Sequence, residues 1–218
     1  PQMKSLFWSL REEIRAAILS LLTWLPTGLG VIARRRLLRH FLGCVGANAR
    51  ILSGLRLTNP EKIRIGSNCN FNHNVYIAGG GEVTIGDWVG FGPDAKIWSV
   101  SHRFDDPDSP WQKQGWIRNP VIIGDDVWVA ANVFVMPGVT IGHGAILSAG
   151  SVVNKSIPPF AIVAGNPARV IGWRRPQVSA AEEEVPSGRS SATITQLTEH
   201  FRRSGNSLGQ AASPQVQA

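Results

Sequence analysis

An aliphatic or aromatic residue returns at nearly every sixth position between residues 65 and 164. The series is most regular at Ile123, Val129, Val135, Ile141 and Leu147. A period of six is neither the two-residue alternation of a strand in a flat sheet nor the 3.6-residue period of a helix. It is typical of short parallel strands joined by tight corners and stacked as a β-helix, whose interior the repeated apolar residues fill.

Similar tetrapeptides open blocks of about three hexads each. They are Ile63-Arg64-Ile65-Gly66, Val83-Thr84-Ile85-Gly86, Val121-Ile122-Ile123-Gly124 and Val139-Thr140-Ile141-Gly142. Each block predicts one turn of a triangular coil. The expected coils are 45–62, 65–82, 85–102, 123–140 and 141–158, with a partial sixth to about Val170. One coil cannot bury its own apolar row, so neighbours must stack. The alternative is an ordinary β-sandwich with coincidental spacing.

The fold class expected is therefore mainly β, a parallel β-helix of about five to six coils. With 218 residues and 43% apolar content, the chain suits one core with extensions. We expect a helical, basic region at 1–44, the coil domain at 45–175 and a polar tail at 176–218. The tail is rich in Ser, Ala, Gln and Glu and is expected to be disordered.

The net charge of +7 is concentrated at the N-terminus, where residues 1–60 hold nine Arg or Lys against two Glu. An amphipathic helix of about five turns is expected there. One face of it carries Leu6, Leu10, Ile14, Ile18 and Leu22. Two interpretations stay open: the helix caps the open end of the coil, or it lies on an anionic membrane surface. Nucleic acid is not expected as a partner.

Neither a signal peptide nor a transmembrane helix is expected, because Pro26, Gly28 and Gly30 interrupt the uncharged run at 16–33. Cys44 and Cys69 show no metal-type spacing and are expected to be reduced and structural. Cytoplasmic residence fits these features.

The hexad series breaks once, leaving residues 103–122 outside the coil as an insertion. Function in solenoids commonly resides in such insertions. The loop carries polar groups with Trp111 and Trp116, a composition suited to binding a hydroxylated ligand. It begins directly after His102, whose imidazole could act as a general base. Taken alone, a single histidine is as well explained as a surface or turn residue.

Several motifs in register closely resemble the hexapeptide-repeat O-acetyltransferases. They are Trp98-Ser99-Val100-Ser101-His102, Pro120 to Ala131, Pro137-Gly138-Val139-Thr140-Ile141-Gly142, Ser148-Ala149-Gly150-Ser151-Val152-Val153 and Ala164-Gly165-Asn166-Pro167-Ala168-Arg169. The match covers roughly residues 45–172. The resemblance implies a left-handed parallel β-helix, a homotrimer, and acetyl-CoA as co-substrate in the cleft between neighbouring subunits, with no metal.

The resemblance also implies roles for individual residues. His102 would deprotonate the acceptor hydroxyl, and the backbone N–H of Ala131 would hold the oxyanion. Residues expected to contact CoA are Trp128, Ala131, Ala149, Lys155 and Arg169. Alternative roles remain for three of these: a surface aromatic for Trp128, a solvated charge for Lys155 and a terminal cap for Arg169.

On the acceptor side, Asn72 matches the asparagine with which sugar acetyltransferases of the family hold a sugar hydroxyl. Trp111 and Trp116 are expected to contribute from the loop. The family's acidic acceptor ligand falls at Gly80, so the acceptor is expected to be held differently here. His73 is interpreted as a corner residue.

The activity expected is acetylation of a sugar hydroxyl in exopolysaccharide, capsule or lipopolysaccharide biosynthesis. The segments 25–30 and 34–39 resemble the leader of members whose acceptors include lipid-linked saccharides, which favours peripheral contact with the inner membrane surface. Acetylation of an antibiotic or other xenobiotic is the alternative. A γ-carbonic-anhydrase-like zinc site around His143 is disfavoured because position 148 is Ser148 rather than histidine. A non-catalytic scaffold also remains open.

Overall fold

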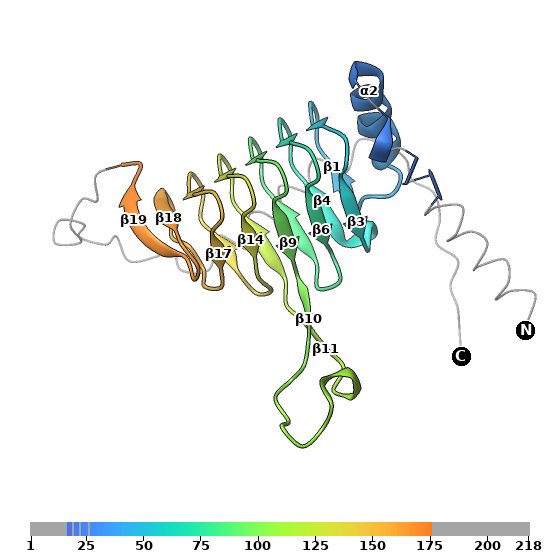
Figure 1. The fold of residues 1–218 in the computed structure, drawn as a ribbon. Coiled ribbons are helices and arrows are strands. Elements are labelled where there is room, and N and C mark those ends of the chain that lie inside the picture. The colour runs from blue at the N-terminus through green and yellow to red at the C-terminus, as the bar shows by residue number, and fades with distance from the viewer. Residues whose placement is uncertain (1–16, 19, 22, 26, 176–218) are drawn as a thin grey trace, which may run out of the picture. The chain divides into compact units, whose positions relative to one another are not determined.

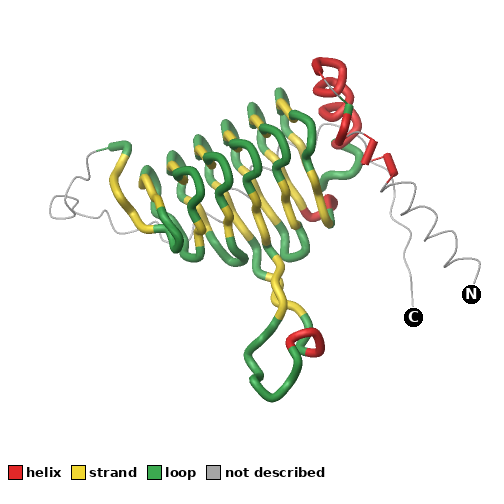
Figure 2. Tube along the Cα trace, viewed as in Figure 1, coloured by secondary structure: helices red, strands yellow, loops and turns green. Residues whose placement is uncertain are grey.

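The computed structural model describes residues 17, 18, 20, 21, 23–25 and 27–175. From Cys44 onward the chain winds as a coil of short strands that stack in register, turn upon turn (Figure 1). Strands and loops alternate regularly along the coil (Figure 2). The expected mainly β, solenoid class is confirmed.

The strands of the coil form three sheets, the three faces of a prism. The first face contains β1 (Cys44–Val45), β4 (Ile63–Ile65), β7 (Val83–Ile85), β12 (Val121–Ile123) and β15 (Thr140–Ile141). The second contains β2 (Arg50–Ile51), β5 (Asn70–Phe71), β8 (Gly90–Phe91), β13 (Trp128–Val129), β16 (Ile146–Leu147), β18 (Ala161–Ala164) and β19 (Arg169–Trp173). The third contains β3 (Arg56–Thr58), β6 (Tyr76–Ala78), β9 (Lys96–Trp98), β14 (Phe134–Val135) and β17 (Val152–Val153).

The interior of the prism is filled by apolar residues that occupy equivalent positions in successive coils. On the first face, Ile65 pairs with Ile85, Ile85 with Ile123 and Ile123 with Ile141, and all four are buried. On the second face the rings of neighbouring phenylalanines, Phe71 and Phe91, stack at 4.7 Å. Each row of apolar side chains is buried from solvent only because the next coil covers it, as the hexad pattern predicts.

The coils are not uniform in length, which corrects the expectation of three hexads throughout. Val45 pairs with Ile65 and Ile65 with Ile85, a spacing of 20 residues, whereas Ile123 pairs with Ile141 at a spacing of 18. The extra residues of the early coils lie where the third face meets the first, at the 3-10 helix Pro60–Lys62 and at the glycines 79–81. We call this border of the prism edge 3–1, and the border between the second and third faces edge 2–3.

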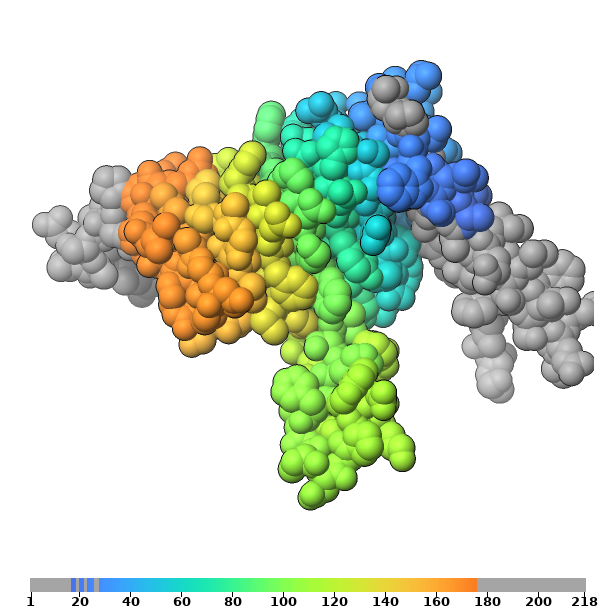
Figure 3. All heavy atoms as spheres, in the orientation of Figure 1, coloured from blue at the N-terminus to red at the C-terminus, as the bar shows by residue number. Residues whose placement is uncertain are grey.

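The insertion is a β-hairpin at edge 3–1. It stands out from the body of the coil (Figure 3). β10 (Val100–His102) pairs antiparallel with β11 (Trp116–Arg118), and the intervening loop contains the 3-10 helix Trp111–Lys113. The excursion therefore spans residues 100–118 rather than the expected 103–122. His102 belongs to the hairpin itself, and Val121 is already buried in β12.

Helix α2 (Thr27–Leu38) covers the first coil. The side of the helix that faces the coil carries Gly30, Arg34 and Leu38, all buried. The guanidinium of Arg34 donates from Nε to the carbonyl oxygen of Ile51 at 2.8 Å and from Nη1 to that of Leu25 at 2.7 Å. The hydrogen bond to Ile51 ties α2 to the first coil.

Most of the amphipathic helix expected at the N-terminus lies outside the described residues, although 17, 18, 20, 21, 23 and 24 are helical. The tail 176–218 also lies outside them. Within the described ranges, no helix is both long and apolar enough to cross a bilayer.

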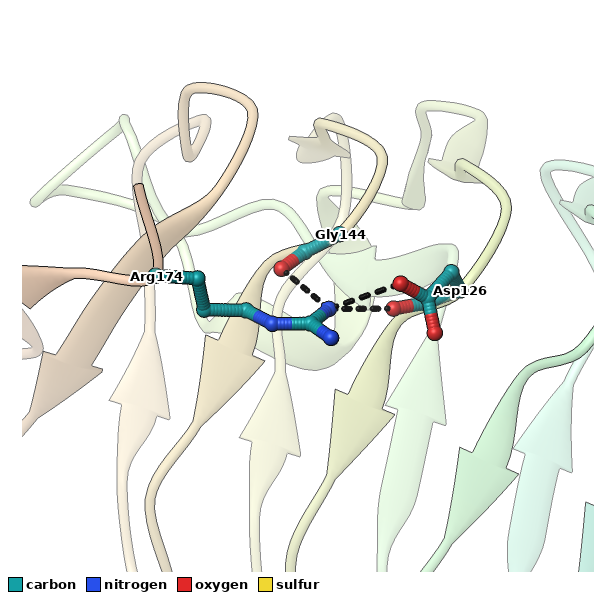
Figure 4. Close-up of polar contacts among 3 residues, drawn as sticks. All are labelled: Asp126, Gly144 and Arg174. Atoms are coloured by element: carbon teal, nitrogen blue, oxygen red, sulfur yellow. Dashed lines mark hydrogen bonds and ion pairs between the residues drawn. The ribbon is translucent and has the colours of Figure 1, made fainter. Parts of the chain in front are cut away.

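The C-terminal end of the coil closes with a reversal of the chain. The expected partial sixth coil stops at β18, and β19 runs back antiparallel to it. Arg174, just after β19, donates from Nη1 to the carboxylate of Asp126 at 2.8 Å and to the carbonyl oxygen of Gly144 at 2.9 Å (Figure 4). One side chain thereby joins the last strand to two successive coils.

Candidate active site

His102 lies at the end of β10, opposite Trp116 of β11. Its imidazole is half-buried between two indoles. The ring centroid of Trp116 is 3.7 Å away, and that of Trp111, which meets the imidazole edge-on, is 4.6 Å away. Each tryptophan remains 50% exposed. The structure thus brings together three of the residues selected from the sequence and leaves the imidazole accessible.

A cleft of about 480 Å³ opens beside His102, between the hairpin and the third face. Its lining residues are Thr58, Asn59, Tyr76, Ala78, Gly80, Trp98, Val100, Ser101, His102, Trp116 and Arg118. The rings of Tyr76 and Trp98 meet edge to face with centroids 6.0 Å apart. Aromatic faces beside hydroxyl and amide groups can hold a polyhydroxylated ligand, and a cleft of this volume suits a small molecule.

Gly80 and Gly81 allow the hairpin to pack tightly against edge 3–1. A Cβ on Gly80 would lie 3.2 Å from Cβ of Val100, and one on Gly81 would meet the carbonyl oxygen of Ser99. The Ser99 hydroxyl donates to the carbonyl oxygen of Ala78 at 2.6 Å and accepts from the N–H of Gly81 at 2.9 Å. This packing fixes the direction in which β10 leaves the coil, and with it the place of His102.

The tip of the hairpin is held by hydrogen bonds of its own. Gln114 donates from Nε2 to the carbonyl oxygens of Asp106 and Ser109 at 2.8 and 2.7 Å, and its Oε1 accepts from the N–H of Asp106 at 3.0 Å. Arg103 and Asp105 form an exposed ion pair at 3.7 Å. The loop that carries Trp111 is therefore an ordered element, and its 3-10 turn places the indole against His102.

A second group of the selected residues lies along edge 2–3. Ala131 and Ala149 occupy successive coils there, and the N–H of Gly150 donates to the carbonyl oxygen of Ala131 at 2.9 Å. Asn72 lies two coils earlier on the same edge, with its Oδ1 accepting from the N–H of His73 at 2.8 Å. Trp128 is 51% exposed on the adjoining second face.

The third face separates edge 2–3 from edge 3–1, so one chain does not bring this second group to His102. Of the two expected cationic contacts, Lys155 follows β17 at edge 3–1 and Arg169 begins β19, and both are exposed. The Arg169 guanidinium donates from Nη1 to the carbonyl oxygen of Ala168 at 2.9 Å. Neither cation lines the cleft.

The remaining polar candidates have structural contacts. His73 Nδ1 lies 2.8 Å from the Ser53 hydroxyl in the preceding coil, as its interpretation as a corner residue requires. His143, considered for zinc, is exposed and packs edge to face on Phe160. Among residues 27–175 and the few described before them, no group of three metal-binding side chains occurs. Burial raises the pKa of the Cys69 thiol to about 11, and neither cysteine is in a disulfide.

The sequence pattern missed the floor of the cleft, formed by Tyr76, Trp98 and Arg118. Tyr76 and Trp98 lie on the outer side of the third face, one coil apart, and β6 pairs with β9 at a spacing of 20 residues. The hexad pattern marks the buried rows and does not identify these outward-facing aromatic residues. Arg118 would have been found only by recognising β11 as a strand paired with β10.

Comparison with known proteins agrees with the fold. Residues 120–155 match the family model described as bacterial transferase hexapeptide (six repeats). Galactoside O-acetyltransferase of Escherichia coli K12 is 35% identical over 139 residues, which are 63% of this chain and 67% of that one. Nodulation protein L of Rhizobium meliloti is 39% identical over 167 residues, or 73% of this chain and 89% of its own.

Solved structures show the same relationship. A hexapeptide-repeat acetyltransferase from Vibrio cholerae, complexed with acetyl coenzyme A, superimposes with a TM-score of 0.67 at 33% identity, covering 75% of this chain and 88% of its own. A galactoside acetyltransferase in complex with coenzyme A superimposes with a TM-score of 0.65 at 32% identity, covering 72% of this chain and 78% of its own.

The coil, the inserted hairpin and these relatives define a transferase built on hexapeptide repeats. The chain belongs to the hexapeptide-repeat acetyltransferases and is an acetyl-CoA-dependent acetyltransferase, similar to those that act on galactosides and maltose.

Proposed function

We propose that the chain transfers an acetyl group from acetyl-CoA to a sugar hydroxyl during the assembly of a surface glycan, with His102 as general base. The observation that supports this most is the position of His102, held by two indoles at the mouth of an aromatic-lined cleft. Indole faces and hydroxyl groups suit a sugar ring better than they suit an apolar ligand.

In this reaction His102 takes the proton of the acceptor hydroxyl as its oxygen attacks the thioester carbon. The oxyanion of the tetrahedral intermediate accepts a hydrogen bond from the backbone N–H of Ala131. Among the described residues that N–H has no other acceptor. Collapse of the intermediate breaks the carbon–sulfur bond, and the imidazolium returns the proton to the departing thiolate of CoA. Acetyl transfer is then complete and His102 is neutral again.

The active unit is a homotrimer in this proposal. His102 and the cleft lie on edge 3–1, whereas Asn72, Ala131 and Ala149 lie on edge 2–3. Two chains related by a rotation can place edge 3–1 of one beside edge 2–3 of the next, and three such contacts close a ring. Acetyl-CoA would lie between the chains, against Trp128, Ala131 and Ala149, with Lys155 and Arg169 near its phosphates.

The acceptor is tested by following free-thiol release from acetyl-CoA with a panel of sugars, sugar nucleotides, lipid-linked saccharides and hydroxylated antibiotics. Mass spectrometry of the products identifies the acetylated compound. Turnover with a glycan, accompanied by a mass increase of one acetyl group, is expected. Turnover confined to the antibiotics would overturn the glycan assignment in favour of drug modification.

Peripheral contact with the cytoplasmic face of the inner membrane completes the proposal. The outward side of α2 is apolar: Leu29 is 80% exposed and Ile32 is 53% exposed, while Arg34 points into the protein. Arg35 and Arg36 are exposed on the same helix. An apolar surface bordered by arginines suits an anionic bilayer, where lipid-linked saccharides are presented.

The membrane contact is tested by sedimentation with vesicles of phosphatidylcholine, alone or with phosphatidylglycerol. Binding is expected to require the anionic lipid and to weaken in the Leu29→Ser, Ile32→Ser double variant. Equal sedimentation of the two proteins with anionic vesicles would contradict a role for this surface.

A further inference from the structure

The cleft beside His102 carries positive charge with no counter-charge in its walls. Of its lining residues, Arg118 is the permanent cation, His102 is the titratable base and none is acidic. The other polar groups of the lining are neutral and include Thr58, Asn59 and Ser101. A ligand that fills the cleft therefore meets an arginine for which the lining offers no carboxylate partner.

Gly80 leaves the wall nearest to the hairpin without a side chain, and so without a carboxylate. Val100 packs against this glycine, and a Cβ there would lie 3.2 to 3.5 Å from three of its side-chain carbon atoms. A residue other than glycine at this position would therefore press on Val100, at the start of the strand that carries His102.

The acidic residues of the hairpin lie at its tip, outside the cleft. Asp105 pairs with Arg103 at 3.7 Å, and Asp106 accepts from the N–H of Asp108 at 2.9 Å through Oδ1. None of these aspartates lines the cleft. Their charges are exposed to solvent, where an aqueous dielectric screens them over about 10 Å.

Arg118 and the base lie on the same two-stranded ladder, with one residue between their positions along each strand. In the antiparallel pair Val100 lies opposite Arg118 and His102 lies opposite Trp116. Arg118 and Trp116 are two positions apart on β11, so they share a face of the hairpin, about 7 Å from each other along the strand. A pyranose ring spans a similar length between a charged substituent at one end and a free hydroxyl at the other.

Trp98 lines the same cleft. Its indole Nε1 is buried and has no hydrogen-bond partner within the part of the chain that the structure describes, although a buried N–H without a partner is costly.

We infer that the acceptor is an anionic sugar, whose carboxylate or phosphate is bound by Arg118 while one of its hydroxyls faces His102. This inference rests on the proposed acetyl transfer to a glycan and names the class of sugar. The guanidinium presents paired donors that match either anion, and such charge-assisted hydrogen bonds are strong. Arg118 is thus a specificity-determining residue.

The test compares neutral and anionic acceptors of matched shape. The pairs are glucose with glucuronate, galactose with galacturonate, and N-acetylglucosamine with its 1-phosphate, so that carboxylate and phosphate form separate arms. We expect kcat/KM from thiol release to favour the anionic member of at least one pair by about 10- to 100-fold. Arg118→Gln is expected to reduce this ratio to near one.

Arg103→Gln serves as the matched control, because it removes an arginine from the same hairpin outside the cleft lining. This variant should keep the preference for the anionic member. Equal kcat/KM for both members of every pair in the wild type would overturn the inference, as would an Arg118→Gln effect confined to the KM for acetyl-CoA.

A binding measurement separates this inference from the proposed reaction. Trp98 and Trp116 line the cleft and Trp111 packs on His102, so tryptophan fluorescence reports acceptor binding without turnover. If no acceptor releases thiol, the proposed function fails. Tighter binding of glucuronate than of glucose, lost in Arg118→Gln, would then still support an anionic ligand, and equal binding of the two would overturn it.

Discussion

Gly81 is a residue at which the fold admits no side chain. A Cβ there would meet the carbonyl oxygen of Ser99 and lie 2.7 Å from the N–H nitrogen of Asn119, which close the neck of the hairpin. Gly81→Ala is expected to lower the free energy of unfolding by about 1 to 3 kcal/mol, because the backbone must shift to accept the methyl group. Urea denaturation measures this loss.

The control for that substitution is Gly28→Ala. Gly28 lies in α2 with nothing within 4 Å of an added Cβ. Since alanine favours helix over glycine, this change should leave stability the same or raise it by up to about 1 kcal/mol. Equal losses in the two variants would contradict the steric account of edge 3–1.

Cys69 is expected to lower the free energy of unfolding as the pH rises into the alkaline range. Burial raises the pKa of its thiol from 9.0 to about 11 in the folded state. The unfolded state therefore loses its proton first, so the stability that the neutral thiol confers is complete below pH 9 and falls as the pH rises towards 11. Urea titrations at pH 8 and 10.5 should show a smaller fall for Cys69→Ala than for the wild type. An identical fall in stability for the two proteins would show that the thiol does not contribute to the pH dependence.

At the scale of elements, the β18–β19 hairpin depends on Arg174. Its guanidinium bridges Asp126 and Gly144 in successive coils (Figure 4). Arg174→Ala is expected to speed amide hydrogen exchange in β18 and β19 by up to about 10-fold, because it loses hydrogen bonds worth roughly 1 kcal/mol after discounting for partial exposure. Arg175→Ala, which removes only the cation over the Phe160 ring, is the comparison variant. Unchanged exchange in Arg174→Ala would contradict this role of the bridge.

The elements also show which parts of the fold the sequence could predict. The hexad positions identify the stacked rows because the interior tolerates only apolar side chains there, as at Ile85 and Ile123. The two additional residues of each early coil were not predicted, since they lie at edge 3–1 outside the apolar rows. The partial sixth coil was expected to run to about Val170, yet Val170 is 44% exposed and belongs to a strand that runs back.

The sequence likewise predicts some residues of the candidate site and misses others. His102 is found next to the break in the hexads, and the tryptophans of the insertion follow from composition. Tyr76, Trp98 and Arg118 depend on coil spacing and strand pairing that hexad counting does not supply.

At the scale of the whole molecule, the separation of the two edges predicts that subunits complement one another. In the proposed trimer each site takes His102 from one chain and Ala131 from the next. His102→Ala and Ala131→Trp chains should each be inactive alone. When they are mixed in equal amounts and refolded together, about a quarter of wild-type turnover should return, since each site draws on two chains independently. No recovery from mixed oligomers would contradict a shared site.

Thiol release from acetyl-CoA in the presence of a turned-over sugar, compared between the wild type and His102→Gln, tests the central claim most directly. His143→Gln is the control, because that imidazole is exposed and packs on Phe160 away from the cleft. Loss of a general base should lower kcat by about 100-fold or more, with unchanged circular dichroism and saturable CoA binding. The control should retain wild-type kcat. A His102→Gln enzyme within about threefold of wild type would contradict the assignment of His102 as the base.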